Sequence, residues 1–199
     1  MKTLNRIFLL LAITSLVVSC SVFNFTDYYK LNDEFTGQKT ISVTQYLKPI
    51  DNKSDVGSVK VIFQRIKIEN NVDFIAYFVI NRYSSTFDLE NKAFLKANGQ
   101  IYELLIDRKN TEYKTSTSTS TSNLTTNDST QVSHISTAET TTRNWYEEKF
   151  SIPLNKDMAS SIIKGNAVIF RFYFGPQVGT YMLTERQIGY IKRMFEDKL

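Results

Sequence analysis

Cys20 is the residue whose type and position most clearly suggest chemistry, and it is the only cysteine in the chain. A basic start containing Lys2 and Arg6 precedes a mostly apolar segment of twelve residues, 7–18, which leads through Ser19 to Cys20. A positively charged start, a short apolar stretch and a small residue are typical of a secretory signal. We therefore expect residues 1–19 to be a signal peptide.

A cysteine in place of an ordinary cleavage site resembles the signal of bacterial lipoproteins. The resemblance implies that Cys20 is the lipid attachment site, that the chain is cut before it, and that the new amino terminus is acylated, with palmitate as the expected acyl group. It also implies a protein anchored in the bacterial cell envelope, in the outer membrane. Two alternatives stay open. One is export with a free thiol, which is liable to oxidation. The other is an uncleaved membrane helix, although twelve residues fall short of the about twenty that a span needs.

The charge balance argues against a nucleic-acid partner. Removing Lys2 and Arg6 leaves 22 basic and 20 acidic residues, so the processed chain is close to neutral. No stripe of Lys and Arg with interleaved aromatic residues is found in the sequence, and nucleic-acid binding normally shows one. The expected partners are the membrane, through the anchor, and an envelope protein. About 180 residues suffice for one core, so we expect a tether at 20–32 and a single β-rich domain at 33–199.

The sequence offers little to a catalytic site. The single histidine, His134, lies in a serine- and threonine-rich stretch, whereas triad catalysis and histidine metal sites need a rigidly held imidazole. Glu147 and Glu148 are adjacent carboxylates, but neighbouring residues of a strand point to opposite faces and cannot contact one substrate together. We interpret them as a solvated strand edge. The sequence thus predicts no enzyme activity, no cofactor and no metal.

Alternating apolar residues predict most of the elements. Expected strands cover residues 39–48, 58–69, 72–83, 93–97, 100–107, 145–152, 167–174 and 180–183. Asn98-Gly99 predicts a tight hairpin, because both residues accept positive φ. A short helix is expected at 155–164 and a C-terminal helix at 184–198, where Thr184 and Gln187 form a capping box. The pattern predicts a mainly antiparallel β-sandwich or open barrel with the C-terminal helix packed on the sheet.

Arg171 is the charge of greatest interest in the predicted strands. It alternates with phenylalanines in 167–174, so Phe170 and Phe172 lie on one face and Arg171 on the other. Two interpretations remain open. Arg171 lies on the outer face of the sheet, or it is a paired internal arginine near a pocket.

Two segments resemble small, uncharacterised, β-rich bacterial lipoproteins. One is the opening Asp33-Glu34-Phe35-Thr36-Gly37, and the other is the late succession of a strand, a turn, an aromatic strand and a terminal helix. The resemblance covers about two-thirds of the processed chain and contains no catalytic motif. It implies a fold and no particular activity.

A low-complexity tract occupies residues 115–142, where eighteen of twenty-eight residues are Ser or Thr and none is Gly, Pro, Lys or Arg. So polar a segment cannot bury enough apolar surface to offset its ordering entropy. We therefore expect a disordered insertion at the end of a hairpin. It is either a neutral repeat expansion or a glycosylated loop, because Asp128-Ser129-Thr130 resembles a bacterial O-glycosylation site with Ser129 as acceptor.

Three functions remain for the domain. The first is a lipid-anchored binding or scaffolding domain of the cell envelope, which an exposed apolar strip would favour. The second is a carbohydrate-contacting surface domain, suggested by eleven tyrosines and one tryptophan, which a flat aromatic platform would favour. The third is a carboxylate-only glycoside hydrolase, which needs two acids about 5 to 10 Å apart in a cleft. We adopt the first as the working hypothesis.

Overall fold

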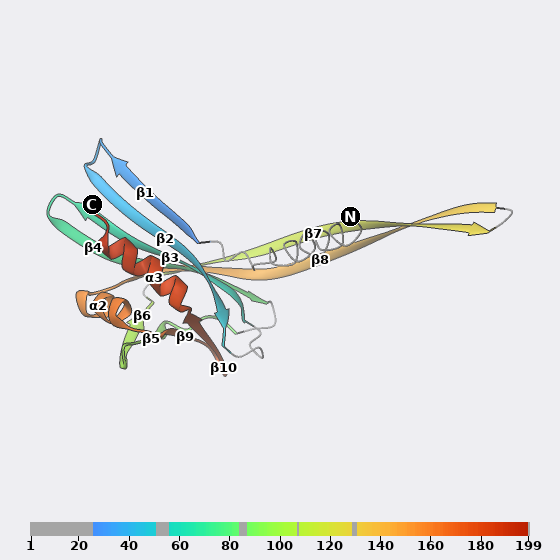
Figure 1. Ribbon diagram of the computed structural model, residues 1–199. Helices are drawn as coiled ribbons and strands as arrows, with labels where there is room; N and C mark the ends of the chain where they lie inside the picture. The colour runs from blue at the N-terminus through green and yellow to red at the C-terminus, as the bar shows by residue number, and fades with distance from the viewer. Residues whose placement is uncertain (1–25, 51–55, 84–86, 107, 129–130, 199) are drawn as a thin grey trace, which may run out of the picture.

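The structure is a computed structural model that describes residues 26–50, 56–83, 87–106, 108–128 and 131–198 (Figure 1). Its strands are β1 Asp27–Asp33, β2 Gln38–Pro49, β3 Val56–Ile68, β4 Asn71–Tyr83, β5 Lys92–Ala97, β6 Gln100–Leu105, β7 Lys109–Asp128, β8 Gln131–Pro153, β9 Val168–Phe174 and β10 Gln177–Leu183. Its helices are α2 Lys156–Lys164 and α3 Glu185–Glu196. No helix in the described part of the chain is long and apolar enough to cross a membrane.

The strands form one antiparallel sheet in the order β6-β5-β9-β10-β2-β3-β4-β8-β7, and β1 also pairs with β2. The contact between β10 and β2 is short, since only Tyr181 and Met182 pair with Pro49 and Lys48. This junction divides the sheet into two parts. We call β6-β5-β9-β10 the small wing, and β1, β2, β3, β4, β8 and β7 the large wing.

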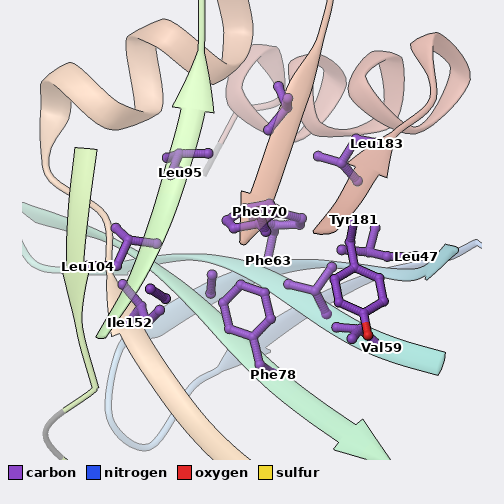
Figure 2. Packing of buried hydrophobic residues seen from close by; sticks show 14 of the residues in the cluster. Leu47, Val59, Phe63, Phe78, Leu95, Leu104, Ile152, Phe170, Tyr181 and Leu183 are labelled. Carbon is purple, nitrogen blue, oxygen red and sulfur yellow. The ribbon is translucent and has the colours of Figure 1, made fainter. Parts of the chain in front are cut away.

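The inner faces of the two wings pack together around the core. Phe170 of the small wing lies 5.2 Å, between ring centroids, from Phe78 of the large wing, and Phe172 lies 5.8 Å from Phe150. Figure 2 shows Phe78 and Phe170 among the aliphatic residues that fill this space. The predicted fold class is confirmed: the described residues are mainly antiparallel β, with an open sheet rather than a closed barrel, and two helices lie among them.

Both helices begin where the sequence predicts, and α3 ends at Glu196, two residues before its expected end. Asn155 caps α2 by accepting a hydrogen bond from the Met158 N–H at 2.8 Å. The capping box of α3 is present, because the Thr184 N–H donates to Gln187 Oε1 at 2.8 Å and the Gln187 N–H donates to Thr184 Oγ1 at 3.3 Å. Met194 is the most buried residue near the end of α3.

The N-terminal strand corrects the expected tether. Residues 27–32, which the sequence assigned to the tether, belong to β1, and this strand pairs with β2 along its whole length. Tyr28 and Lys30 share one face of β1 and both contact the carboxylate of Asp197 beyond α3, Lys30 at 2.7 Å. The two ends of the domain are therefore joined by side-chain contacts, and the folded unit begins by Asp27.

The Ser/Thr-rich tract corrects the expected disorder. Residues 115–128 and 131–142 belong to β7 and β8, which pair continuously from Lys109 opposite Phe150 to Asp128 opposite Gln131. Threonine is β-branched and favours the extended backbone, and strict Ser-Thr alternation at 115–122 places the threonines on one face. Facing threonine hydroxyls lie within 3.5 Å of each other in two cross-strand pairs. We call residues 115–142 the arm, which projects well beyond the wings in Figure 1.

Candidate functional site

Sheet register places Arg171 in the middle of the outer face of the small wing. Phe94 of β5 and Thr180 of β10 lie directly opposite Arg171 in the neighbouring strands. Ile169 and Tyr173 lie two residues away along β9, on the same face. The interpretation of Arg171 as an outer-face residue is confirmed, because its side chain is exposed while Phe170 and Phe172 are fully buried.

A concave pocket surrounds this arginine. Its volume is about 540 Å³, and its lining consists of Ile50, Phe94, Lys96, Ile101, Ile169, Arg171, Tyr173 and Thr180. Ile50 reaches the rim because its N–H donates to the carbonyl of Thr180 at 2.8 Å, which continues the sheet past the end of β2. Pockets of this size commonly hold small molecules.

The surface around the pocket is unusually apolar for the solvent side of a sheet. Side chains between 42% and 66% exposed gather on this face: Ile50, Ile101, Leu105, Val178 and Met182. Phe94 and Tyr173 are half-buried and meet edge to face, with ring centroids 5.9 Å apart. Exposed apolar side chains gathered on one face in this way are typical of an interaction site.

The charge of the pocket is positive. Arg171 and Lys96 are the charged residues of the lining, and neither forms an ion pair within the described part of the chain. Glu103, on the outer face of β6, is paired instead with Lys92 at 3.3 Å, and Lys92 lies 5.0 Å above the ring of Phe94. The surface therefore combines an apolar floor with two cations that have no anionic partner among the described residues.

The carboxylates at the base of the arm are structural. Glu148 is 1% exposed and accepts from Arg82 Nε at 2.8 Å and from Thr111 Oγ1 at 2.5 Å. The solvated edge expected for Glu148 is wrong, because its side chain faces inward, where the buried Arg82 compensates its charge. Glu147 lies on the other face, 2.9 Å from Lys149 Nζ, so the two acids are separated by the sheet as predicted.

A second pocket of about 730 Å³ lies where the arm leaves the large wing. Tyr83 and Trp145 are directly opposite each other across β4 and β8 and both line it. Trp145 Nε1 and Asn81 Oδ1 are buried and have no hydrogen-bond partner among the described residues. This pocket thus has an aromatic pair in its lining, and two of its lining residues carry a buried donor and a buried acceptor without a partner among the described residues.

Of the residues singled out by the sequence, Arg171 lines the first pocket, whereas His134, Glu147 and Glu148 line neither pocket. Cys20 and Ser129 lie outside the described residues, and His134 lies in the arm, opposite Thr125. Within the described ranges no three His, Cys, Asp or Glu side chains gather as a metal site would need. Comparisons with protein-family models, with curated proteins and with solved structures found no match.

Sequence reasoning found Arg171 but missed the surface around it. One signal was present, because the outward positions of β6 and β9 include Ile101, Leu105 and Ile169, where a solvated strand would carry polar residues. Ile50 and Lys96 had no such signal, because their place at the pocket depends on which strands become neighbours.

Proposed function

We propose that this protein is a lipid-anchored binding or scaffolding domain of the bacterial outer membrane, without catalytic activity, and that the outer face of the small wing is its binding surface. The exposed apolar surface around Arg171 supports this proposal most directly, because such a surface is costly to leave in water and gains free energy when a partner covers it. The lipoprotein-like signal ending at Cys20 supports the anchor.

The position of β1 adds a geometric argument. Seven residue steps separate Cys20 from Asp27, the first residue of β1, and even a fully extended chain of that length spans at most about 25 Å. A lipid on Cys20 would therefore hold the domain close to the membrane surface. We infer that the binding surface works on molecules or proteins found there.

Fractionation of cells tests the anchor. Two or three acyl chains give stable anchoring, since each buried CH₂ contributes roughly 0.8 kcal/mol. Cys20→Ala should move the protein from the detergent-soluble membrane fraction into the soluble fraction, or leave an unprocessed precursor. A variant that is still processed and membrane-bound would contradict lipidation at Cys20.

Site-specific crosslinking in intact cells tests the binding surface. A photoreactive residue at position 101, in the small wing, should give discrete products. The matched control is position 77, which is also exposed but lies on β4 of the large wing. Equal products at the two positions would contradict a binding role for the small wing.

A carbohydrate-contacting surface is the alternative that a specific observation favours. A sugar hydroxyl both donates and accepts hydrogen bonds, which matches the unpartnered Trp145 Nε1 and Asn81 Oδ1 beside Tyr83. Trp145 is the only tryptophan, so its fluorescence reports directly on this pocket. Titration with chitohexaose and maltohexaose should change the fluorescence if the alternative is correct. Neither pocket has an Asp or Glu in its lining, so neither offers the acid pair of a glycoside hydrolase.

A further inference from the structure

We propose that the pocket around Arg171 binds a single anionic amphiphile, a molecule with an acyl-like apolar body and an oxyanion head, and that Arg171 and Lys96 hold the head. This inference rests on the proposed binding role of the small wing and names the chemistry of what that surface binds. A carboxylate and a phosphate present the same kind of oxyanion. The experiment below therefore compares a ligand with a carboxylate head with one that has a phosphate head.

The pocket has an apolar lining that can contact the apolar body of such a ligand. Phe94 and Tyr173 form an edge-to-face wall, and Ile101 and Ile169 continue it on either side of Lys96 across the same three strands. Ile50 closes the opposite rim beside Thr180. A volume of about 540 Å³ lies within the range that accommodates a small molecule rather than a protein segment.

Two cations of the pocket, Arg171 and Lys96, lie close enough together to bind one anionic head. Lys96 is opposite Ile169 and Arg171 is opposite Phe94, so the two cations are diagonal neighbours on adjacent antiparallel strands. Such neighbours are separated by about 7–8 Å, and two long side chains can close on one anion across that distance. The guanidinium offers a planar pair of donors that matches a carboxylate or a phosphate, and the Thr180 hydroxyl on β10 is a further donor in the lining.

Charge complementarity excludes the other simple ligands. A cationic amphiphile would meet Arg171 and Lys96 with no carboxylate in the lining to receive it. A neutral one would cover both cations without replacing their hydration, which costs free energy. Glu103, an acid on the same face, is not part of the lining and pairs with Lys92 at 3.3 Å. The proposed anchor also keeps the pocket near a bilayer, where anionic amphiphiles are available.

Photolabelling of the full-length protein tests the proposal. The protein is purified in dodecyl maltoside, a neutral detergent, and irradiated with a 16-carbon fatty acid that carries a diazirine in its chain. Mass spectrometry should place the label on β5, β6 or β9. Unlabelled hexadecanoate and hexadecyl phosphate are competitors that compare the two oxyanions, and hexadecanol is the neutral control. At least one oxyanion should compete about tenfold more effectively than hexadecanol, since hydrogen bonds to charged groups are the strong ones.

Two variants separate head recognition from apolar binding. Arg171→Gln and Lys96→Gln should each reduce labelling of the small wing, Arg171→Gln by about tenfold. Arg186→Gln removes an exposed arginine from α3, outside the pocket, and should leave labelling unchanged. Because Arg171 and Lys96 are exposed, their variants should melt like the parent protein, and a circular dichroism melt checks this.

The results of the photolabelling experiment can be told apart from a failure of the proposed binding role of the small wing. Labelling of the small wing that is the same in Arg171→Gln, or that hexadecanol blocks as well as the oxyanions do, overturns the anionic head but leaves an apolar binding surface. Labelling elsewhere overturns the pocket as the site. The position-101 crosslinks described above report on the binding surface independently of both results.

Discussion

The wings and the arm are both antiparallel β-structure, but they are held together in different ways. In the wings, alternate residues of each strand enter a shared core, and Phe170, Phe172 and Phe174 are fully buried there. In the arm, Ser and Thr alternate along residues 115–122, where every side chain is exposed or half-buried, and the contacts across the two strands include hydroxyl pairs such as Thr119 with Thr140 at 3.3 Å. The same backbone pairing therefore occurs with a core and without one.

The comparison shows that strand formation and stability are separate properties. β-branched residues and continuous backbone pairing suffice to define the ribbon, yet an isolated two-stranded ribbon is only marginally stable in water. The arm continues β7 and β8 beyond the region where β8 is paired to β4. Its base carries the buried ion pair between Arg82 and Glu148. We infer that the wings fix the register of the arm and that the arm contributes little to the wings.

The largest expected effect comes from the core of the wings. Phe172 contacts the rings of Phe78, Phe150, Phe170 and Tyr181. Phe172→Ala should lower the free energy of unfolding by about 3–5 kcal/mol, the usual cost of truncating a buried aromatic residue. Urea denaturation measures this change. A loss below about 1 kcal/mol would show that the two wings do not share one core.

The next effect is expected at the base of the arm. Glu148→Ala removes the buried carboxylate that pairs with Arg82 Nε at 2.8 Å, while the exposed Asp88 stays 2.5 Å from the guanidinium, and should cost about 3 kcal/mol in the free energy of unfolding. The adjacent Glu147→Ala is the matched control, because Glu147 is partly exposed and its pair with Lys149 should contribute about 1 kcal/mol or less. If urea denaturation showed the same loss of unfolding free energy in both variants, the larger contribution expected of the buried pair would be refuted.

A smaller, pH-dependent effect is expected where β1 meets the end of α3. Burial, followed by the hydrogen bond to Asp197, raises the pKa of Tyr28 to about 12 from its ordinary value of 10.0. Because the folded-state pKa is the higher one, the contribution of Tyr28 is present below pH 10 and is lost as the pH rises towards 12. The melting temperature should therefore fall more between pH 9 and pH 11.5 in the parent protein than in Tyr28→Phe.

The neighbouring Tyr29 supplies the control for this measurement, because it is 58% exposed on the other face of β1. Tyr29→Phe should keep the full alkaline loss. For Asp197 the dependence of stability on pH has the opposite sign. Lys30, and then Tyr28, lower the pKa of Asp197, so its contribution is present above about pH 4 and disappears as the pH falls below that value. An alkaline loss that is identical in all three proteins would contradict the contact between Tyr28 and Asp197.

The smallest effect is expected in the arm. Replacing residues 115–142 by Asn-Gly should change the free energy of unfolding by about 1 kcal/mol or less, since none of residues 115–122 and 138–142 is buried and loop closure depends weakly on length. Thr119→Ala should stay within about 0.5 kcal/mol. Differential scanning calorimetry of the shortened protein measures the first change. A drop of several degrees in its melting temperature would show that the arm packs on the wings.

Much of the local structure could be predicted from the sequence. The alternation in 167–174 gave the buried and exposed faces of β9 correctly, and Asn98 and Gly99 adopt the positive φ values, 48° and 76°, of the expected hairpin turn. The capping box at the start of α3 was also predicted. These features depend on residues within a few positions of one another, so a short stretch of sequence contains the whole cause.

The arm and β1 were missed because composition was weighed without pairing. A polar tract cannot build a core, and from this we expected disorder at 115–142. Continuous pairing between two β-branched strands was not considered, although the alternation of Ser and Thr was visible. The strand nature of Asp27–Asp33 depends on β2 lying beside it and on Asp197 meeting Tyr28, 169 residues further along the chain.

By itself, the sequence determined the periodicity of the strands and the positions of turns and caps. The tertiary structure alone decided that Glu148 is buried against Arg82, and that Arg171 is surrounded by side chains from β5, β6 and β10 and by Ile50, which follows β2. The physical reason is that burial and electrostatic environment are properties of neighbours in space. Here some of those neighbours come from strands far apart in the chain, such as β5 beside β9 and β4 beside β8, and the order of the strands settles which of them meet.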